Sequence, residues 1–279
     1  MKNGVVRNWM TGDVISTPPY TRMHDALRLM RREKIRSLPI VDESSLVGVV
    51  TLRDLLRADT STVIKDAWDQ YRQVGNEPVS RIMTKGAVTI SSEAPVARAA
   101  RVMMENKFSS IPVVNADGVM VGIITSSDLF RMIIDEVPLL DEPIIVADYM
   151  TSEPVVVDPE TSLLDIHRLM GVKRIRAIPV VQEKLLVGIV TFTDVVSADP
   201  SAFTTRGNQE ISNKIQSTPV RYVMTSSPIT IRQTSSITEA ARLMLHNKIH
   251  SLPVMNDKET LVGMITETDL FRLIVNRFL

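Results

Sequence analysis

Four threonine–aspartate pairs recur along the chain, each preceded by a glycine and two apolar residues, with two residues between threonine and aspartate. Such a pair can cap a helix, because the hydroxyl and the carboxylate each accept a hydrogen bond from a free backbone N–H. The same groups can hold a ligand, since a helix N-terminus attracts phosphate and an ionised carboxylate accepts hydrogen bonds from a diol such as ribose. The pairs are Thr51 and Asp54, Thr125 and Asp128, Thr191 and Asp194, and Thr266 and Asp269.

These residues alone leave both interpretations open, because a duplication copies a helix cap as faithfully as a binding site. The two residues inside the motif vary between copies: Leu-Arg, Ser-Ser, Phe-Thr and Glu-Thr. Arg53 would add positive charge beside a bound phosphate, whereas Glu267 would oppose it. If the motifs bind a ligand, the four sites should therefore differ in affinity.

A second polar set precedes a proline that lies in a short apolar run of each copy. Basic side chains there could hold a phosphate, or could form an ordinary solvated corner between a helix and a strand. Three residues before the proline stand Arg36, Ser109, Arg176 and His250, and two before it stand Ser37, Ser110, Ala177 and Ser251. Basic residues also stand five before the proline, where they suit the negative end of a helix dipole: Lys34, Lys107, Arg174 and Lys248.

The spacing of these motifs shows how the chain is built. A Met-Thr pair opens each copy at Met10, Met83, Met150 and Met224, so the steps are 73, 67 and 74 residues. This long-short-long pattern indicates a duplicated pair of repeats, with the extra residues at 58–78 and 198–219. Each unit is too short to bury both faces of its elements alone, so the repeats should pack in pairs.

The third repeat shows the order of elements. Residues 154–157 are a β-branched run typical of a strand, and apolar residues recur at helical spacing over 163–170. Strands are predicted at 177–181 and 185–191, and a second helix starts near 194. The sequence thus predicts an α/β (α+β) unit in the order strand, helix, strand, strand, helix.

This order and these motifs resemble the CBS domain, and the resemblance covers nearly the whole chain. It implies four CBS repeats in two tandem Bateman modules that form a pseudo-symmetric disc, the plan of the gamma subunit of AMP-activated protein kinase. The first module would span residues 1–139, with repeats at 5–58 and 78–135. The second would span 140–279, with repeats at 145–198 and 219–276.

The resemblance also implies a function. Proteins of this family bind adenine nucleotides (AMP, ADP or ATP) reversibly in clefts between paired repeats and act as regulatory sensors. The aspartates would hold ribose hydroxyls, the threonines would lie near ribose and phosphate, and the residues before the proline would line the phosphate end. In the family, each cleft joins the aspartate of one repeat to the pre-proline corner of its pair-mate. Asp128 would then face Arg36, Asp269 would face Arg176, Asp194 would face His250, and Asp54 would face only Ser109 and Ser110.

The adenine end of each cleft would need apolar walls. We expect the candidates to be core residues first and pocket residues second. They are Ile15, Val88, Val155 and Ile229 near the repeat starts, and Val49, Ile123, Ile189 and Met264 two residues before each threonine. A different kind of function also fits: a protein-interaction scaffold whose clefts are empty or hold S-adenosylmethionine or another adenosyl compound.

Composition narrows the classes of protein. The chain carries 32 basic and 32 acidic residues, without the basic excess of a nucleic-acid binder, and no apolar run long enough to cross a membrane. It has no cysteine, and His246 and His250 are a possible metal pair without a nearby cluster of acids. We therefore expect a cytoplasmic protein with no metal and no cofactor beyond its regulatory ligand. Without a catalytic set of residues we expect no enzyme. The chain would signal to a separate effector protein, as a monomer or as a homodimer.

Overall fold

The computed structural model describes residues 4–60, 76–198 and 217–278, and most of the two longer connections between repeats lies outside this range. Each repeat contributes a β-hairpin and two helices, as the sequence predicts. In the first repeat these are α1 (Met23–Glu33), β1 (Ser37–Asp42), β2 (Ser45–Thr51) and α2 (Leu52–Thr60). In the third they are α6 (Leu163–Lys173), β8 (Ala177–Gln182), β9 (Leu185–Thr191) and α7 (Phe192–Ala198), and the repeat opens on β7 (Thr151–Ser152).

The second and fourth repeats carry two short strands ahead of the same elements. The second has β3 (Thr84–Lys85), β4 (Ile90–Ser91), α4 (Val96–Asn106), β5 (Ser110–Val114), β6 (Met120–Thr125) and α5 (Ser126–Glu136). The fourth has β10 (Thr225–Ser226), β11 (Ile231–Arg232), α9 (Ile237–Asn247), β12 (Ser251–Met255), β13 (Leu261–Thr266) and α10 (Glu267–Arg277). Single 3-10 turns precede the repeats at Val6–Asn8, Val79–Arg81, Val146–Asp148 and Val220–Tyr222, and another follows α5 at Val137–Leu139.

One predicted strand is wrong. Residues 154–157 form only a single parallel bridge, between Val157 and Val180 of β8. The corresponding β4 and β11 are two residues long and pair in parallel with β5 and β12. β-branched residues favour extended backbone, but this segment lies at the sheet edge and gains few ladder hydrogen bonds there.

The repeats pair by exchanging their opening residues. β3 opens the second repeat and pairs with β2 of the first, and Thr11 of the first repeat bridges Ile123 of the second. In the second module β10 pairs with β9 and β7 with β13. The sheet of each repeat is therefore completed by residues of the paired repeat, so the two repeats of a pair are joined by backbone hydrogen bonds.

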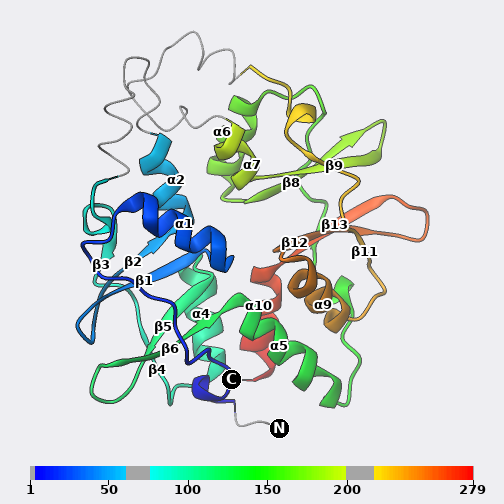
Figure 1. Ribbon diagram of the computed structural model, residues 1–279. Helices are drawn as coiled ribbons and strands as arrows, with labels where there is room; N and C mark the ends of the chain where they lie inside the picture. The colour runs from blue at the N-terminus through cyan, green and yellow to red at the C-terminus, as the bar shows by residue number, and fades with distance from the viewer. Residues whose placement is uncertain (1–3, 61–75, 199–216, 279) are drawn as a thin grey trace.

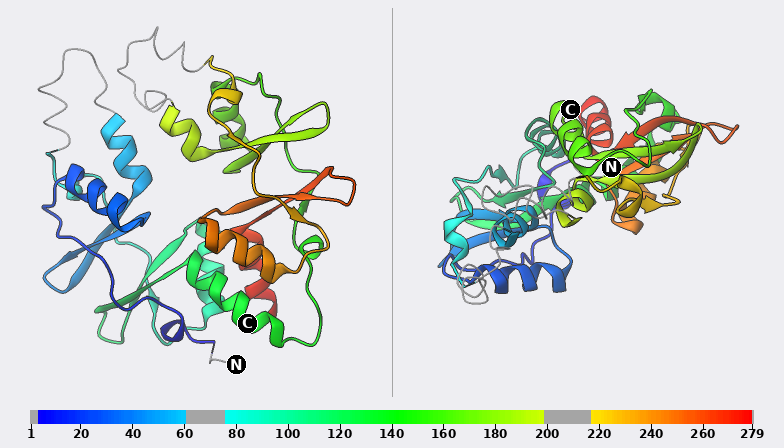
Figure 2. Two further views of the ribbon diagram at one scale, coloured as in Figure 1. Left: turned by 45° about the vertical axis from the view of Figure 1, so that its right-hand side comes forward. Right: turned by 90° about the horizontal axis from the view of Figure 1, so that it is seen from above.

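The two modules meet through the second and fourth repeats. Helix α4 packs against α10 and α5 against α9, and α5 and α10 lie side by side (Figure 1). One core cluster includes Phe130 of α5 and Phe271 of α10, whose rings stack 6.5 Å apart, whereas the first and third repeats each keep a separate core. The repeats thus follow one another around a common centre in the order first, second, fourth, third (Figures 1 and 2).

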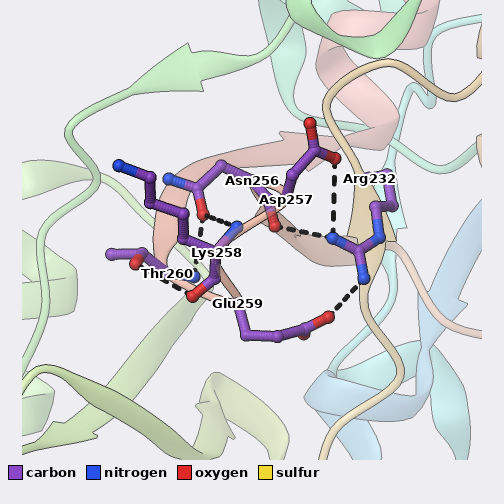
Figure 3. Close-up of polar contacts among 6 residues, drawn as sticks. All are labelled: Arg232, Asn256, Asp257, Lys258, Glu259 and Thr260. Atoms are coloured by element: carbon purple, nitrogen blue, oxygen red, sulfur yellow. Dashed lines mark hydrogen bonds and ion pairs between the residues drawn. The ribbon is translucent and has the colours of Figure 1, made fainter.

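Local contacts explain two further sequence patterns. The basic residues five before each proline are C-caps in the left-handed region, with φ of 55° at Lys34, 59° at Lys107, 54° at Arg174 and 56° at Lys248. In the fourth repeat, Arg232 of β11 donates 2.8 Å to the Asn256 carbonyl and pairs with Glu259, which fixes the β12–β13 loop to the neighbouring strand (Figure 3). Within the described part of the chain, no helix is long and apolar enough to cross a membrane.

Candidate functional site

The threonine–aspartate pairs form the predicted capping boxes in all four repeats. Each aspartate Oδ2 accepts from the threonine N–H at 2.8–2.9 Å and from the threonine hydroxyl at 2.6–2.7 Å. The pairs lie at the start of α2, α5, α7 and α10, where free backbone donors remain. Capping thus uses one carboxylate oxygen and leaves the other for a second partner.

That second oxygen distinguishes the repeats. In the second and fourth repeats it accepts from an arginine one turn later, Arg131 at 2.6 Å from Asp128 and Arg272 at 2.9 Å from Asp269. Burial raises the pKa of both aspartates, although their threonines and arginines oppose this shift. Asp54 and Asp194 are only half-buried, and no described residue bonds their second oxygens. Their carboxylates are therefore less committed than those of Asp128 and Asp269.

The pre-proline corner lies next to the capping box of its own repeat. The residue after each threonine donates its backbone N–H to the backbone carbonyl of the residue three positions before the proline, at 2.8–2.9 Å. These bonds join Leu52 to Arg36, Ser126 to Ser109, Phe192 to Arg176, and Glu267 to His250. Ser37, Ser110, Ala177 and Ser251 follow at the starts of β1, β5, β8 and β12, opposite the threonines of the motif. The two polar sets predicted from the sequence are thus neighbours within each repeat.

The charged side chains of these corners meet between repeats, at Glu267. Its Oε2 accepts from the Ser126 hydroxyl at 2.9 Å and lies 2.9 Å from Nδ1 of His250, and its Oε1 lies 3.2 Å from the Arg176 guanidinium. Arg176 also donates to the Lys107 carbonyl. The family pattern pairs Asp128 with Arg36 and Asp194 with His250. Among the described residues, Arg176 and His250 contact Glu267, which the sequence marks only as the acidic variant of the motif interior.

Electrostatics keeps this carboxylate ionised. Burial acts to raise the pKa of Glu267, but the contact and charge of His250, the Ser126 hydroxyl and the charge of Arg36 outweigh burial, and the pKa lies below its ordinary value. The residue is 7% exposed. The ionised carboxylate of Glu267 therefore compensates the positive charge of basic residues that come from different repeats.

The candidate apolar walls divide into two groups. Ile189 and Met264 are buried and Val49 and Ile123 half-buried, as expected for core residues beside a pocket. The expectation of a core position is wrong for Ile15, Val88 and Ile229, which are 37%, 44% and 41% exposed, while Val155 is half-buried. Val88 and Ile229 precede the short edge strands β4 and β11, and Ile15 precedes the single bridge at Thr17, so the sheet does not cover them. Apolar side chains are thus exposed at one equivalent position in three repeats.

The motif interiors of the first and third repeats also meet. The Arg53 guanidinium carbon lies 4.3 Å from the centre of the Phe192 ring, a cation–π contact that joins the two modules. Arg53 is therefore directed at an aromatic ring of the other module. His246 is exposed on α9 while His250 lies at Glu267, and the described residues contain no group of three or more His, Cys, Asp or Glu arranged to hold a metal.

Comparison with known proteins agrees with this architecture. The family profile of the CBS domain matches residues 6–61, 79–135, 146–201 and 220–276. The chain belongs to the CBS-domain family, and its four repeats form two tandem Bateman modules.

Full-length relatives share the plan. The uncharacterized protein MJ1225 of Methanocaldococcus jannaschii is 28% identical over 268 residues, which cover 93% of this chain and 94% of that protein. Its crystal structure, described as that of a candidate archaeal homologue of g-AMPK, covers 97% of this chain and 99% of that chain with 25% identity and a TM-score of 0.74. An uncharacterized conserved protein of Pyrococcus horikoshii has the same fold, with 22% identity, a TM-score of 0.65 and coverage of 97% of this chain and 100% of that one.

Proposed function

We propose that this protein is a regulatory sensor that reversibly binds adenine nucleotides (AMP, ADP or ATP) in clefts between paired repeats and signals to a separate effector protein. The observation that carries the proposal is the hydrogen bond between each capped helix start and its pre-proline corner, formed in all four repeats at 2.8–2.9 Å. This bond brings a hydroxyl, a carboxylate and, in three repeats, a basic side chain close together in space.

Each part of a nucleotide finds a matching group. Ribose hydroxyls can donate to the carboxylates of the capping boxes, of which Asp54 and Asp194 have the more accessible second oxygens. A phosphate can take donors from Arg36, Arg176 and His250 and from the helix starts. The exposed side chains of Ile15, Val88 and Ile229 offer apolar surface to a base. Likeness to MJ1225, a candidate homologue of g-AMPK, is consistent with this assignment.

A second candidate function follows from Glu267. A carboxylate among the basic residues opposes a phosphate, and would suit a scaffold with empty clefts or an adenosyl ligand without phosphate, such as S-adenosylmethionine. The two are separated by calorimetric titration of the purified protein with AMP, ADP, ATP, adenosine and S-adenosylmethionine. We expect AMP to bind more tightly than adenosine, with the difference decreasing as salt is added. Tighter binding of S-adenosylmethionine or adenosine than of every nucleotide would favour the second function.

The proposal assigns no reaction to this chain. The carboxylates of the motif are committed to helix caps, and none of them contacts a nucleophile or a group positioned as a general base among the described residues. Binding would act instead by favouring one arrangement of the repeats over another, to the extent that the ligand contacts the two arrangements differently. Incubation of each nucleotide with the protein, followed by mass analysis, should return it unchanged.

A further inference from the structure

Glu267 lies where groups of three repeats meet, and the charge of a fourth repeat also acts on it. The second repeat provides the Ser126 hydroxyl, the third the Arg176 guanidinium and the fourth His250, while the charge of Arg36 from the first repeat also acts on the carboxylate. No other carboxylate in the described part of the chain is recorded with partners from so many repeats. The contact between Ser126 and Glu267 spans the boundary between the modules, where α5 and α10 lie side by side (Figure 1).

The fold does not require an acid at this position. The equivalent residues are Leu52, Ser126 and Phe192, all uncharged. Helix α10 is capped by Thr266 and Asp269, so Glu267 is not needed for the cap. Burial of a carboxylate costs free energy unless partners compensate for it. Because Glu267 is buried and charged but does not cap its helix, we infer that its role lies in its contacts with Ser126, Arg176 and His250.

The groups around Glu267 match the needs of a phosphate. Guanidinium groups bind phosphate and carboxylate oxygens in the same way, and an imidazole and a hydroxyl add further donors. The Glu267 carboxylate therefore occupies a place that an external anion would also take. The Arg176 guanidinium lies 3.2 Å from the carboxylate and the charge of Arg36 also acts on it, so two guanidinium charges act on one carboxylate.

We call Arg36, Arg176 and His250 the central basic cluster. We propose that the Glu267 carboxylate is the resident anion of this cluster, that is, the anion bound there in the absence of ligand, and that a phosphate-bearing ligand binds by displacing it. Glu267 then sets how strongly the protein prefers phosphorylated ligands over their unphosphorylated forms. Its displacement also breaks the Ser126–Glu267 contact between modules, which converts binding into a change at the module boundary. This inference rests on the proposed function, because the phosphate is that of the nucleotide.

The test replaces the charge without changing the shape. Glu267→Gln keeps an oxygen that accepts from Ser126 but removes the negative charge. Glu239→Gln makes the same change on the exposed surface of α9 in the same repeat and is the matched control. Each protein is titrated calorimetrically with AMP, adenosine and inorganic pyrophosphate, after cooperative thermal unfolding shows that it is folded.

We expect Glu267→Gln to bind AMP and pyrophosphate about tenfold more tightly than the unchanged protein, since an anion no longer competes with a charge-assisted contact. Adenosine affinity and all values for Glu239→Gln should stay the same. An unchanged ratio of AMP to adenosine affinity in Glu267→Gln would overturn the resident-anion proposal while leaving the nucleotide sensor intact. If no adenosyl compound binds either protein but pyrophosphate binding still rises, the sensor proposal is wrong and the central anion site stands.

A second measurement needs no substitution. In the unchanged protein, displacement of Glu267 should alter amide hydrogen exchange in peptides that cover residues 261–272, because the start of α10 loses its contact with Ser126. AMP and pyrophosphate should increase this exchange relative to adenosine. Equal protection with all three ligands at saturation would count against displacement.

Discussion

Gly122 of β6 lies against Met10, which opens the pair-mate repeat. A Cβ added at Gly122 would come within 2.5 Å of the Met10 sulphur and 3.0 Å of the Thr11 carbonyl oxygen. The same contact recurs between Gly48 and Met83, between Gly188 and Met224, and between Gly263 and Met150. The glycine that closes each repeat and the methionine that opens its partner are therefore two halves of one contact, which forms when the opening segment pairs with the partner's sheet.

Gly122→Ala should destabilise the protein by about 1–3 kcal/mol, because the methyl group overpacks a site bounded by backbone. Gly171→Ala is the control: Gly171 lies in helix α6 with open space around it, and alanine there should stabilise by about 0.5–1 kcal/mol. Urea unfolding measures both. Equal effects of the two substitutions would show that the glycine–methionine contact does not limit the packing of the module.

The sequence predicts what lies within a repeat and misses what lies between repeats. The capping boxes and the helix bounds follow from local chemistry, so the residues from Thr191 to Asp194 behave as predicted. The meeting of Arg176 with Glu267 joins residues 91 positions apart and depends on how the modules pack, which no periodicity within a repeat encodes. The exposure of Ile15 was missed for a related reason, because an apolar residue at a sheet edge has the same pattern as one in the core.

Phe130 belongs to a core shared by both modules, and its replacement should affect both. Phe130→Ala should cost about 3–5 kcal/mol, since the ring is fully buried and stacks on Phe271. Amide exchange should rise in α9 and α10 as well as in α5. Leu55→Ala, in the separate core of the first repeat, should raise exchange only in that repeat. Exchange confined to the second repeat in Phe130→Ala would contradict a shared core.

Two buried carboxylates should give opposite pH dependences. The pKa of Glu267 lies below its ordinary value of 4.5, so its contribution to stability is present above that pH and is lost as pH falls through the lower folded value. The pKa of Asp128 lies above its ordinary value of 3.8, mainly through burial, so its contribution is present below that pH and is lost as pH rises through the higher folded value.

The measurement is the free energy of unfolding between about pH 3 and pH 6, the range in which carboxyl groups titrate. The stability of the unchanged protein minus that of Glu267→Gln should decrease as pH falls. The stability of the unchanged protein minus that of Asp128→Asn should decrease as pH rises. If both differences decrease as pH rises, the contacts of Glu267 do not outweigh its burial; if both decrease as pH falls, the contacts of Asp128 outweigh its burial.

Asp194 can be separated from its role as a helix cap by comparison with Asp165. Asp165 accepts from the Ser162 hydroxyl at 2.7 Å at the start of α6, a related cap away from the candidate site that shares the hydroxyl contact of Asp194. Either aspartate replaced by alanine should lose about 1 kcal/mol of stability through the weakened cap. Only Asp194→Ala should weaken nucleotide binding at its own cleft, by about 1.5–3 kcal/mol for a lost charged hydrogen-bond partner. Calorimetric titration with AMP then decides between cap and site: matching affinities and stoichiometries in the two variants would leave Asp194 a cap alone.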